Sequence, residues 1–122
     1  PTQPRIGLMK LDVEGGELAV LQGASGLLAG GCVPNIVFEE HALAQSVVVP
    51  HLSGLGYRMY AIHVGLLRPR LVPLAARGQG ARGTNFLATL DADEALRRFE
   101  RLGYRALAKR ACGKPKRSSG AR

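Results

Sequence analysis

The hydrophobic pattern of the first forty residues predicts a strand, a helix and a second strand. Residues 6–11 (IGLMKL) are mostly apolar, as in a short strand. After Gly15 and Gly16, apolar residues return at helical spacing. They are Leu18, Leu21, Ala24, Leu27 and Leu28. We expect one helix ending near Gly30, then a strand over residues 36–39 (IVFE), with the two strands parallel and joined by a right-handed crossover.

A short helix is expected next, although the pattern there is mixed. Within residues 45–55, three consecutive valines (47–49) favour a strand, while Pro50 suits the first turn of a helix. Apolar residues farther along this segment keep helical spacing. We favour a helix that ends at Gly56.

Two further strands and a final helix complete the predicted elements. The strands cover residues 57–62 and 84–90, and an irregular segment with several arginines lies between them. Asp91 is placed to cap a helix, with Glu94 as its capping-box partner. The apolar face of this helix holds Leu96, Phe99 and Leu102. Gly103 is expected to end it.

The net charge of +8 is concentrated at the C-terminal end. Seven of the 17 basic residues and none of the acids follow residue 103, so the first 103 residues hold ten bases and nine acids. We therefore expect a nearly neutral partial domain over residues 1–103 and a basic, disordered tail over residues 104–122. A length of 122 residues predicts one small domain or part of one.

Cysteine content and hydropathy predict a cytoplasmic protein. Cys32 and Cys112 lie 80 positions apart and do not form a disulfide framework. No uninterrupted apolar run is long enough to cross a membrane, and no signal peptide is visible. Because the chain begins at Pro1 and enters a strand almost at once, we also expect it to be an excerpt of a longer protein.

Two patterns in the sequence resemble binding motifs but lack the context that such motifs require. Residues 78–83 (GQGARG) match a dinucleotide-binding loop, but the segment after them favours a strand instead of the helix that such a loop requires. The three histidines, at positions 41, 51 and 63, lack the spacing of a zinc site, and surface or loop positions are expected for them. Neither pattern therefore defines a cofactor or metal site.

Charged residues interrupt the first strand near its C-terminal end. Alternation places Lys10 and Asp12 on one face, where a strand buried under helices should be apolar. Open α/β sheets bind ligands at the C-terminal ends of their strands. Because buried charges are tolerated chiefly in pairs, we expect a Lys10–Asp12 contact and a functional role for Asp12. Glu14 can serve either a ligand or the start of the following helix.

A second group of polar residues follows the second strand. Glu39 and His41 share a face if the strand continues that far, and either side chain can contact a ligand. A single carboxylate beside one imidazole is a weak signal, and a plain surface position is the alternative. No nucleophile elbow of the G-x-S-x-G type accompanies them.

These residues resemble the FkbM-type family of S-adenosylmethionine-dependent methyltransferases. Residues 10–15 (KLDVEG), followed by Glu17-Leu18 and by residues 21–24 (LQGA), are similar to the family's K-I-D-V-E-G-x-E-x-x-V-L-x-G-A signature. Residues 34–41 (PNIVFEEH), 55–57 (LGY) and 85–89 (NFLAT) resemble its later blocks in the same order. The resemblance covers roughly residues 6–102.

The resemblance implies an α/β fold, namely the C-terminal half of a Rossmann-like class I methyltransferase sheet. Such a sheet is mostly parallel, with the last two strands forming an antiparallel edge pair. The family's first strand and its glycine-rich S-adenosylmethionine loop should precede Ile6, so the main cofactor loop is expected outside this chain. No cofactor-binding residue within the chain is predicted.

The implied reaction is methyl transfer to a hydroxyl oxygen of a small molecule or sugar. We expect Asp12 to accept the hydroxyl proton and Lys10 to orient it, as the catalytic residues. Glu14, Glu39 and His41 are the candidate substrate-binding residues. Two carboxylates at Asp12 and Glu14 do not by themselves establish a metal site, and none is predicted.

Two other interpretations remain open at this point. The chain can be an inactive, truncated remnant of a methyltransferase. Alternatively, it can be a noncatalytic basic module that binds nucleic acid, with an affinity that falls steeply as the salt concentration rises. The nearly neutral charge of residues 1–103 argues against nucleic-acid binding. No membrane partner is expected. A small-molecule or glycan acceptor is the expected partner, and the isolated chain is expected to oligomerise or aggregate through exposed strand edges.

Overall fold

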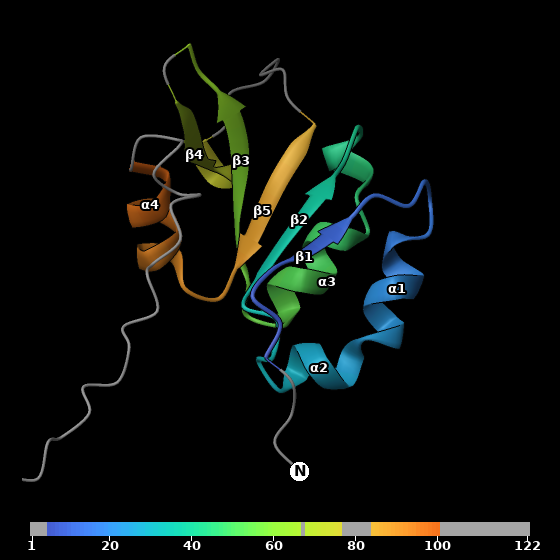
Figure 1. Cartoon of the computed structure of the whole chain (residues 1–122). Coiled ribbons are helices and arrows are strands. Elements are labelled where there is room, and N and C mark those ends of the chain that lie inside the picture. Colours follow the sequence, from blue (N-terminus) through green and yellow to red (C-terminus); the bar gives the residue numbers. More distant parts are fainter. Residues whose placement is uncertain (1–4, 67, 77–83, 101–122) are drawn as a thin grey trace, which may run out of the picture.

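The computed structural model describes residues 5–66, 68–76 and 84–100 as a single mixed sheet with helices on both faces (Figure 1). Its elements in chain order are β1 (Met9–Leu11), α1 (Glu17–Gly23), α2 (Ser25–Ala29), β2 (Asn35–Glu39), the 3₁₀ turn η1 (Leu43–Gln45), α3 (Val48–Gly54), β3 (Arg58–Val64), β4 (Pro69–Pro73), the 3₁₀ turn η2 (Leu74–Ala76), β5 (Asn85–Thr89) and α4 (Ala92–Glu100). The α/β class expected from the sequence is confirmed.

The five strands lie in the order β1-β2-β5-β3-β4. β1 and β2 run parallel, with Leu11 beside Phe38, as the predicted crossover requires. β5 is antiparallel to both β2 and β3, and β4 is antiparallel to β3. The expectation of a mostly parallel sheet is therefore wrong for this part of the chain, because only the β1–β2 pairing is parallel.

The predicted antiparallel edge pair is also placed differently. The last two expected strands, β3 and β5, do pair antiparallel, but β5 is interior and separates β2 from β3. The edge strand on that side is β4, which lies in the segment predicted to be irregular. Strand Pro69–Pro73 has a proline at each end, and a sheet edge is where a strand tolerates the missing amide donors.

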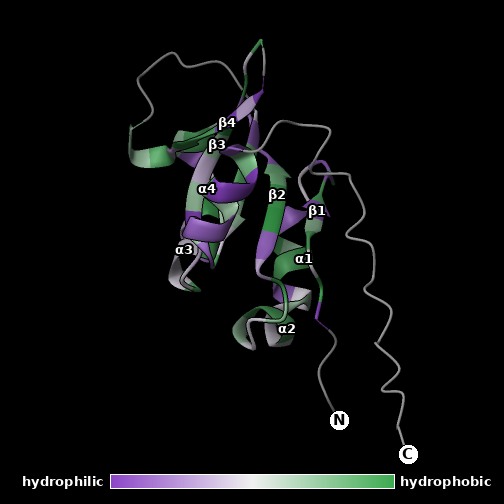
Figure 2. Cartoon of the chain, turned by 60° about the vertical axis from the view of Figure 1, so that its left-hand side comes forward, coloured by the Kyte–Doolittle hydropathy of each residue, from purple (hydrophilic) through white to green (hydrophobic). Residues whose placement is uncertain are grey.

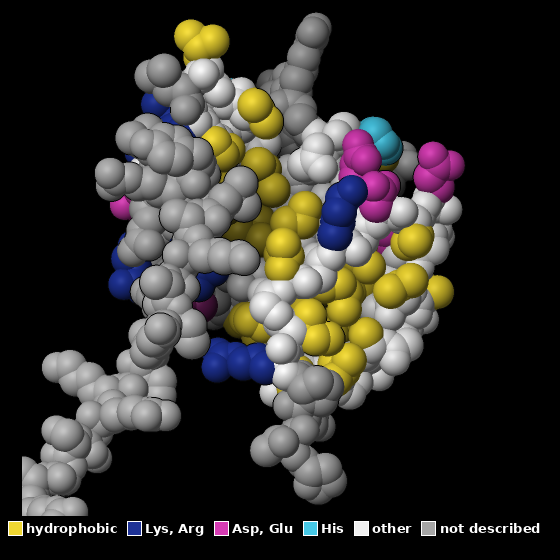
Figure 3. All heavy atoms as spheres, in the orientation of Figure 1, with side chains coloured by type: hydrophobic (Ala, Val, Ile, Leu, Met, Phe, Trp, Pro, Cys, Tyr) yellow, Lys and Arg dark blue, Asp and Glu magenta, His cyan; other side chains and the backbone are white. Residues whose placement is uncertain are grey.

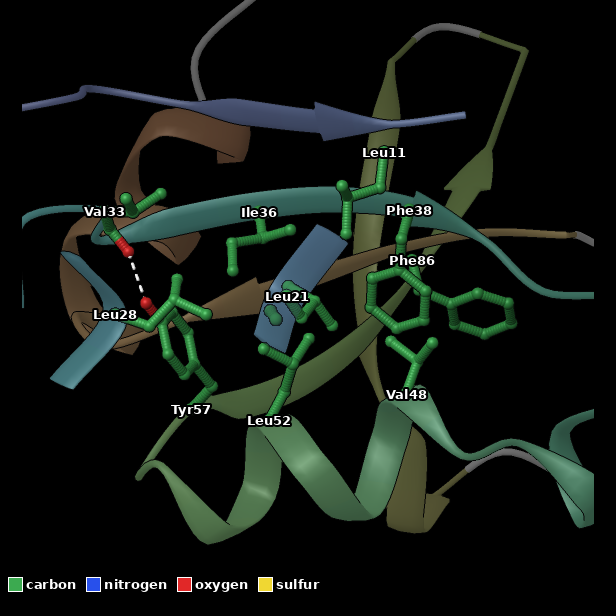
Figure 4. Close-up of a cluster of buried hydrophobic side chains, with 11 residues drawn as sticks. Leu11, Leu21, Leu28, Val33, Ile36, Phe38, Val48, Leu52, Tyr57 and Phe86 are labelled. Atoms are coloured by element: carbon green, nitrogen blue, oxygen red, sulfur yellow. Dashed lines mark hydrogen bonds between the residues drawn. The ribbon is translucent and has the colours of Figure 1, made fainter. Parts of the chain in front are cut away.

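The core is divided between the two faces of the sheet. On one face, α1, α2 and α3 bury a cluster that includes Leu21, Leu28, Ile36 and Phe38 (Figure 4). On the other, α4 covers a smaller cluster around Leu87 of β5. In Figure 2 much of β2 is hydrophobic, whereas α4 presents largely hydrophilic residues outward. Each interior strand is thus buried by alternate residues on opposite faces.

The predicted first helix is two helices in the structure. α1 ends at Gly23 and α2 begins at Ser25, with Ala24 between them at ψ 7°. Gly23 and Gly26 lower the local helix propensity, which favours a break there. The predicted termination is confirmed, since α2 ends at Ala29 and Gly31 adopts a left-handed φ of +65°.

The two later helices begin as the sequence predicts. α3 includes Pro50 in its first turn, and the Ser46 hydroxyl accepts a hydrogen bond from the Val49 amide. For α4, the Glu94 amide donates to Asp91 Oδ1 at 3.0 Å. The reciprocal half of the capping box is replaced, because the Asp91 amide donates to the Thr89 hydroxyl at 3.1 Å. Leu102 and the predicted stop at Gly103 lie outside the described residues.

Candidate functional site

The C-terminal ends of β1 and β2 form a hollow of about 380 Å³ that we call the acidic pocket. It is lined by Asp12, Val13, Glu14, Gly15, Glu17, Glu39, Glu40, His41 and Ala42. Figure 3 shows acidic side chains and a histidine gathered over the ends of these two strands, next to a basic side chain. Four predicted site residues, Asp12, Glu14, Glu39 and His41, therefore line one pocket, although they come from two separate segments of the chain.

Local chain geometry explains how β1 delivers its carboxylates. Leu11 is buried against the helices, so Asp12 emerges at the strand end on the opposite side. The chain then turns, with the Gly16 amide donating to the Val13 carbonyl at 3.0 Å. Gly15 has a φ of +77°, a conformation that favours glycine. This turn folds Glu14 and Glu17 back along the side of the pocket.

Lys10 and Asp12 form the predicted ion pair, with Lys10 Nζ 2.7 Å from Asp12 Oδ2. The pair is exposed, not buried, because the Lys10 and Asp12 side chains are 66% and 59% accessible. The expectation of a buried pair is wrong, since in the part of the chain described here no helix covers this face of β1. The Lys10 hydrogen bond still lowers the pKa of Asp12, and the Asp12 carboxylate raises the pKa of Lys10.

Glu39 is held from two directions at the end of β2. The Thr84 hydroxyl donates to Glu39 Oε1 at 2.8 Å, and His41 Nε2 lies 3.7 Å from the same oxygen. β2 ends at Glu39, so the shared strand face predicted for Glu39 and His41 does not extend to His41, yet the two side chains still meet. The Glu39 carboxylate also contributes to raising the pKa of Lys10, which links the two strand ends electrostatically.

The chain matches the family model of the methyltransferase FkbM domain over residues 2–106, most of its length. It belongs to the FkbM methyltransferase family. No curated protein and no solved structure matches it. The resemblance drawn from the strand-end signature is thereby confirmed, and the acidic pocket of this FkbM domain contains the acidic residues of that signature.

The carboxylates of the pocket suit the binding of hydroxyl groups and positive charge. Carboxylates accept hydrogen bonds from hydroxyl groups and attract cations, and five of them line the pocket. Within the described ranges, no group of three or more His, Cys, Asp or Glu side chains has the arrangement of a metal site. Nor does any helix there have the length and hydropathy of a membrane span.

Sequence reasoning missed two carboxylates of the acidic pocket, Glu17 and Glu40, and one residue that contacts Glu39 from outside the pocket, Thr84. Glu40 lies directly before His41, and its carboxylate Oε1 accepts the Ala42 amide at 3.1 Å, which shapes the loop after β2. Thr84 is 45 residues from Glu39 along the chain and meets it only because β5 inserts beside β2. Glu40 could have been found from its place in the strand-end block, whereas nothing near Thr84 in the sequence points to the contact.

The glycine-rich segment and the remaining histidines agree only in part with the positions expected from the sequence. The glycine-rich residues 78–83 lie outside the described residues, but β5 follows them from Asn85, so the expectation that no helix follows them is confirmed. His63 lies exposed on β3. His51 differs from the expected surface or loop position, because it is in α3 and its Nε2 is buried.

Proposed function

We propose that this FkbM domain takes part in S-adenosylmethionine-dependent methyl transfer to a hydroxyl oxygen of a small molecule or sugar. The observation that carries the proposal is the Lys10–Asp12 pair, which opens onto the acidic pocket at the end of a parallel strand, beside Glu39 and His41. The residues of the family signature are thus placed where an acceptor can reach them. Glu14, Glu39 and His41 line the acceptor side in this proposal.

Asp12 acts as the proton acceptor in the proposed reaction. The Asp12 carboxylate is ionised at neutral pH, as an ordinary aspartate is, and the Lys10 hydrogen bond lowers its pKa further, so it can accept a hydrogen bond from the acceptor hydroxyl before the reaction. A hydroxyl becomes much more acidic as its oxygen is alkylated, which lets even a weak base take the proton late in the step. Lys10 orients the carboxylate through Oδ2.

S-adenosylmethionine supplies a methyl group carried on a positively charged sulfonium. The residues present fit that end of the cofactor, because the carboxylates of the acidic pocket favour a positive charge nearby. The nucleotide and amino-acid parts of the cofactor would bind the glycine-rich loop that, by the family resemblance, precedes Ile6. The rest of a Rossmann-like sheet would pair with the outer edge of β1.

We propose a cytoplasmic protein with a small-molecule or glycan acceptor. Without a strand on the outer edge of β1, the 122-residue chain should bind S-adenosylmethionine poorly and associate with itself through that edge. Calorimetric titration and sedimentation of the isolated chain measure both properties, and saturable binding near micromolar concentrations by a monomer would contradict this part of the proposal.

The direct test uses the full-length protein and S-adenosylmethionine labelled in its methyl group. The label should appear on members of a panel of methyl glycosides and hydroxylated aromatic compounds, and mass spectrometry of the product should place it on oxygen. Label transferred to nitrogen would contradict hydroxyl methylation. A full-length protein that binds the cofactor but transfers no label to any of these hydroxyl acceptors would contradict the proposed reaction class.

A further inference from the structure

We propose that Thr84 is a positioning residue for the acidic pocket, and that its hydroxyl holds the Glu39 carboxylate in the orientation that receives the acceptor. The inference rests on the proposed function, because it assigns Thr84 a role in acceptor binding. It goes beyond that function by bringing β5, the inserted antiparallel strand, into the site. Thr84 itself does not line the pocket and acts through Glu39.

Thr84 is fixed by the backbone before its side chain makes any contact. The Glu40 amide donates to the Thr84 carbonyl at 2.8 Å, which extends the β2–β5 ladder one step beyond the pairing of Glu39 with Asn85. The hydroxyl of Thr84 then donates to Glu39 Oε1 at 2.8 Å. Two hydrogen bonds therefore join Thr84 to adjacent residues at the end of β2, and the hydroxyl has a defined place.

Both side-chain contacts of Glu39 in the described part of the chain fall on the same oxygen. Thr84 Oγ1 and His41 Nε2 approach Oε1, which leaves Oε2 to receive a hydroxyl of the acceptor. Glu39 is 40% exposed, and an exposed glutamate without such a contact samples several rotamers. The Thr84 hydrogen bond restricts that freedom before the acceptor arrives, which favours binding through preorganisation.

The first arm of the test measures the Glu39 side chain without any acceptor. Thr84→Val removes the hydroxyl and keeps the β-branched shape, while Thr84→Ser keeps the hydroxyl. Three-bond NMR couplings should show one dominant Glu39 rotamer in the wild type and in Thr84→Ser, and averaged couplings in Thr84→Val. Thr89→Val is the matched control, because it removes a hydroxyl at the other end of β5, where Thr89 bonds Asn35.

The second arm measures acceptor kinetics in the full-length protein, with a methyl glycoside that the wild type methylates. Thr84→Val should raise KM for this acceptor about fivefold, the effect of losing roughly one hydrogen bond, and leave kcat within about twofold. Thr84→Ser should restore the wild-type KM. Thr89→Val should leave KM unchanged, even if it lowers the melting temperature, because Thr89 is buried away from the pocket.

The two arms separate failure of this inference from failure of the proposed function. Unchanged Glu39 couplings in Thr84→Val would overturn the positioning role outright. Averaged couplings with an unchanged KM would overturn the role in acceptor binding and leave only a structural hydrogen bond. A wild type that methylates no hydroxyl, while its couplings behave as stated, would reject the proposed function and with it the acceptor role of Thr84.

Discussion

Removal of the Tyr57 hydroxyl should destabilise the fold measurably. Tyr57 is 3% exposed, and its hydroxyl donates to the Val33 carbonyl at 2.6 Å (Figure 4). Val33 is fully buried, so Tyr57→Phe leaves a carbonyl oxygen without this donor in a dry environment. The expected cost is about 2 kcal/mol, within the usual range for a buried group that loses its partner. For a domain of this size, that cost lowers the melting temperature by roughly 8 to 16 °C.

The assay is thermal and urea unfolding followed by circular dichroism, with Tyr60→Phe as the control. Tyr60 is also buried, but its hydroxyl makes no hydrogen bond in the described structure, so the control should change stability much less. Equal stability of Tyr57→Phe and the wild type would refute the reasoning. The Tyr57–Val33 bond lies at the start of β2, the end opposite the acidic pocket, so the site should survive the change.

Because of Tyr57, the stability of the fold should also depend on pH in the alkaline range. Burial raises the pKa of Tyr57, so the folded state keeps a proton that the unfolded state loses near pH 10. The stabilising contribution is therefore complete below about pH 10 and declines as the pH rises through the folded-state pKa. Urea midpoints measured between pH 8 and 11 should fall more steeply for the wild type than for Tyr57→Phe, and parallel curves would contradict the assignment.

Two smaller changes test the electrostatics of the site and the start of α4. Lys10→Met should raise the pKa of Asp12, because the Lys10 hydrogen bond is the main cause of its lowering, and an NMR titration of the Asp12 carboxyl with an unchanged midpoint would contradict this. Asp91→Ala removes the acceptor of the Glu94 amide and should cost about 1 kcal/mol in urea unfolding. Asp93→Ala, which removes an acid from the first turn of α4 but keeps the Asp91 cap, should lower the free energy of unfolding by less. Equal losses of stability in the two variants would argue against the capping role of Asp91.

The sequence predicts local elements well because their signals are local. The glycine stop after α2, the proline in the first turn of α3 and the Asp91 cap all depend on residues within a few positions of each other. The strand-end carboxylates could also be placed, since parallel strands bring their C-terminal ends to one edge of a sheet. Asp12 and Glu39 thus line one pocket at the ends of the paired strands β1 and β2.

Strand order and exposure could not be obtained in the same way. The position of β5 between β2 and β3 depends on pairing between residues some fifty positions apart, such as Ile36 and Ala88, and no local pattern encodes it. The Thr84–Glu39 contact follows from that insertion. The exposure of Lys10 depends on what covers β1, which the alternation of its own residues does not specify.

The most direct test of the account is the single-turnover rate of methyl transfer in full-length Asp12→Asn. This change keeps the shape of the side chain and removes the proton acceptor that Lys10 orients. Asp93→Asn, an exposed acid on α4 away from the acidic pocket, is the matched control. We expect a rate about 10²- to 10⁴-fold lower for Asp12→Asn, with unchanged S-adenosylmethionine affinity and melting temperature, and a wild-type rate for the control. A folded Asp12→Asn protein that transfers methyl groups at the wild-type rate would contradict this expectation.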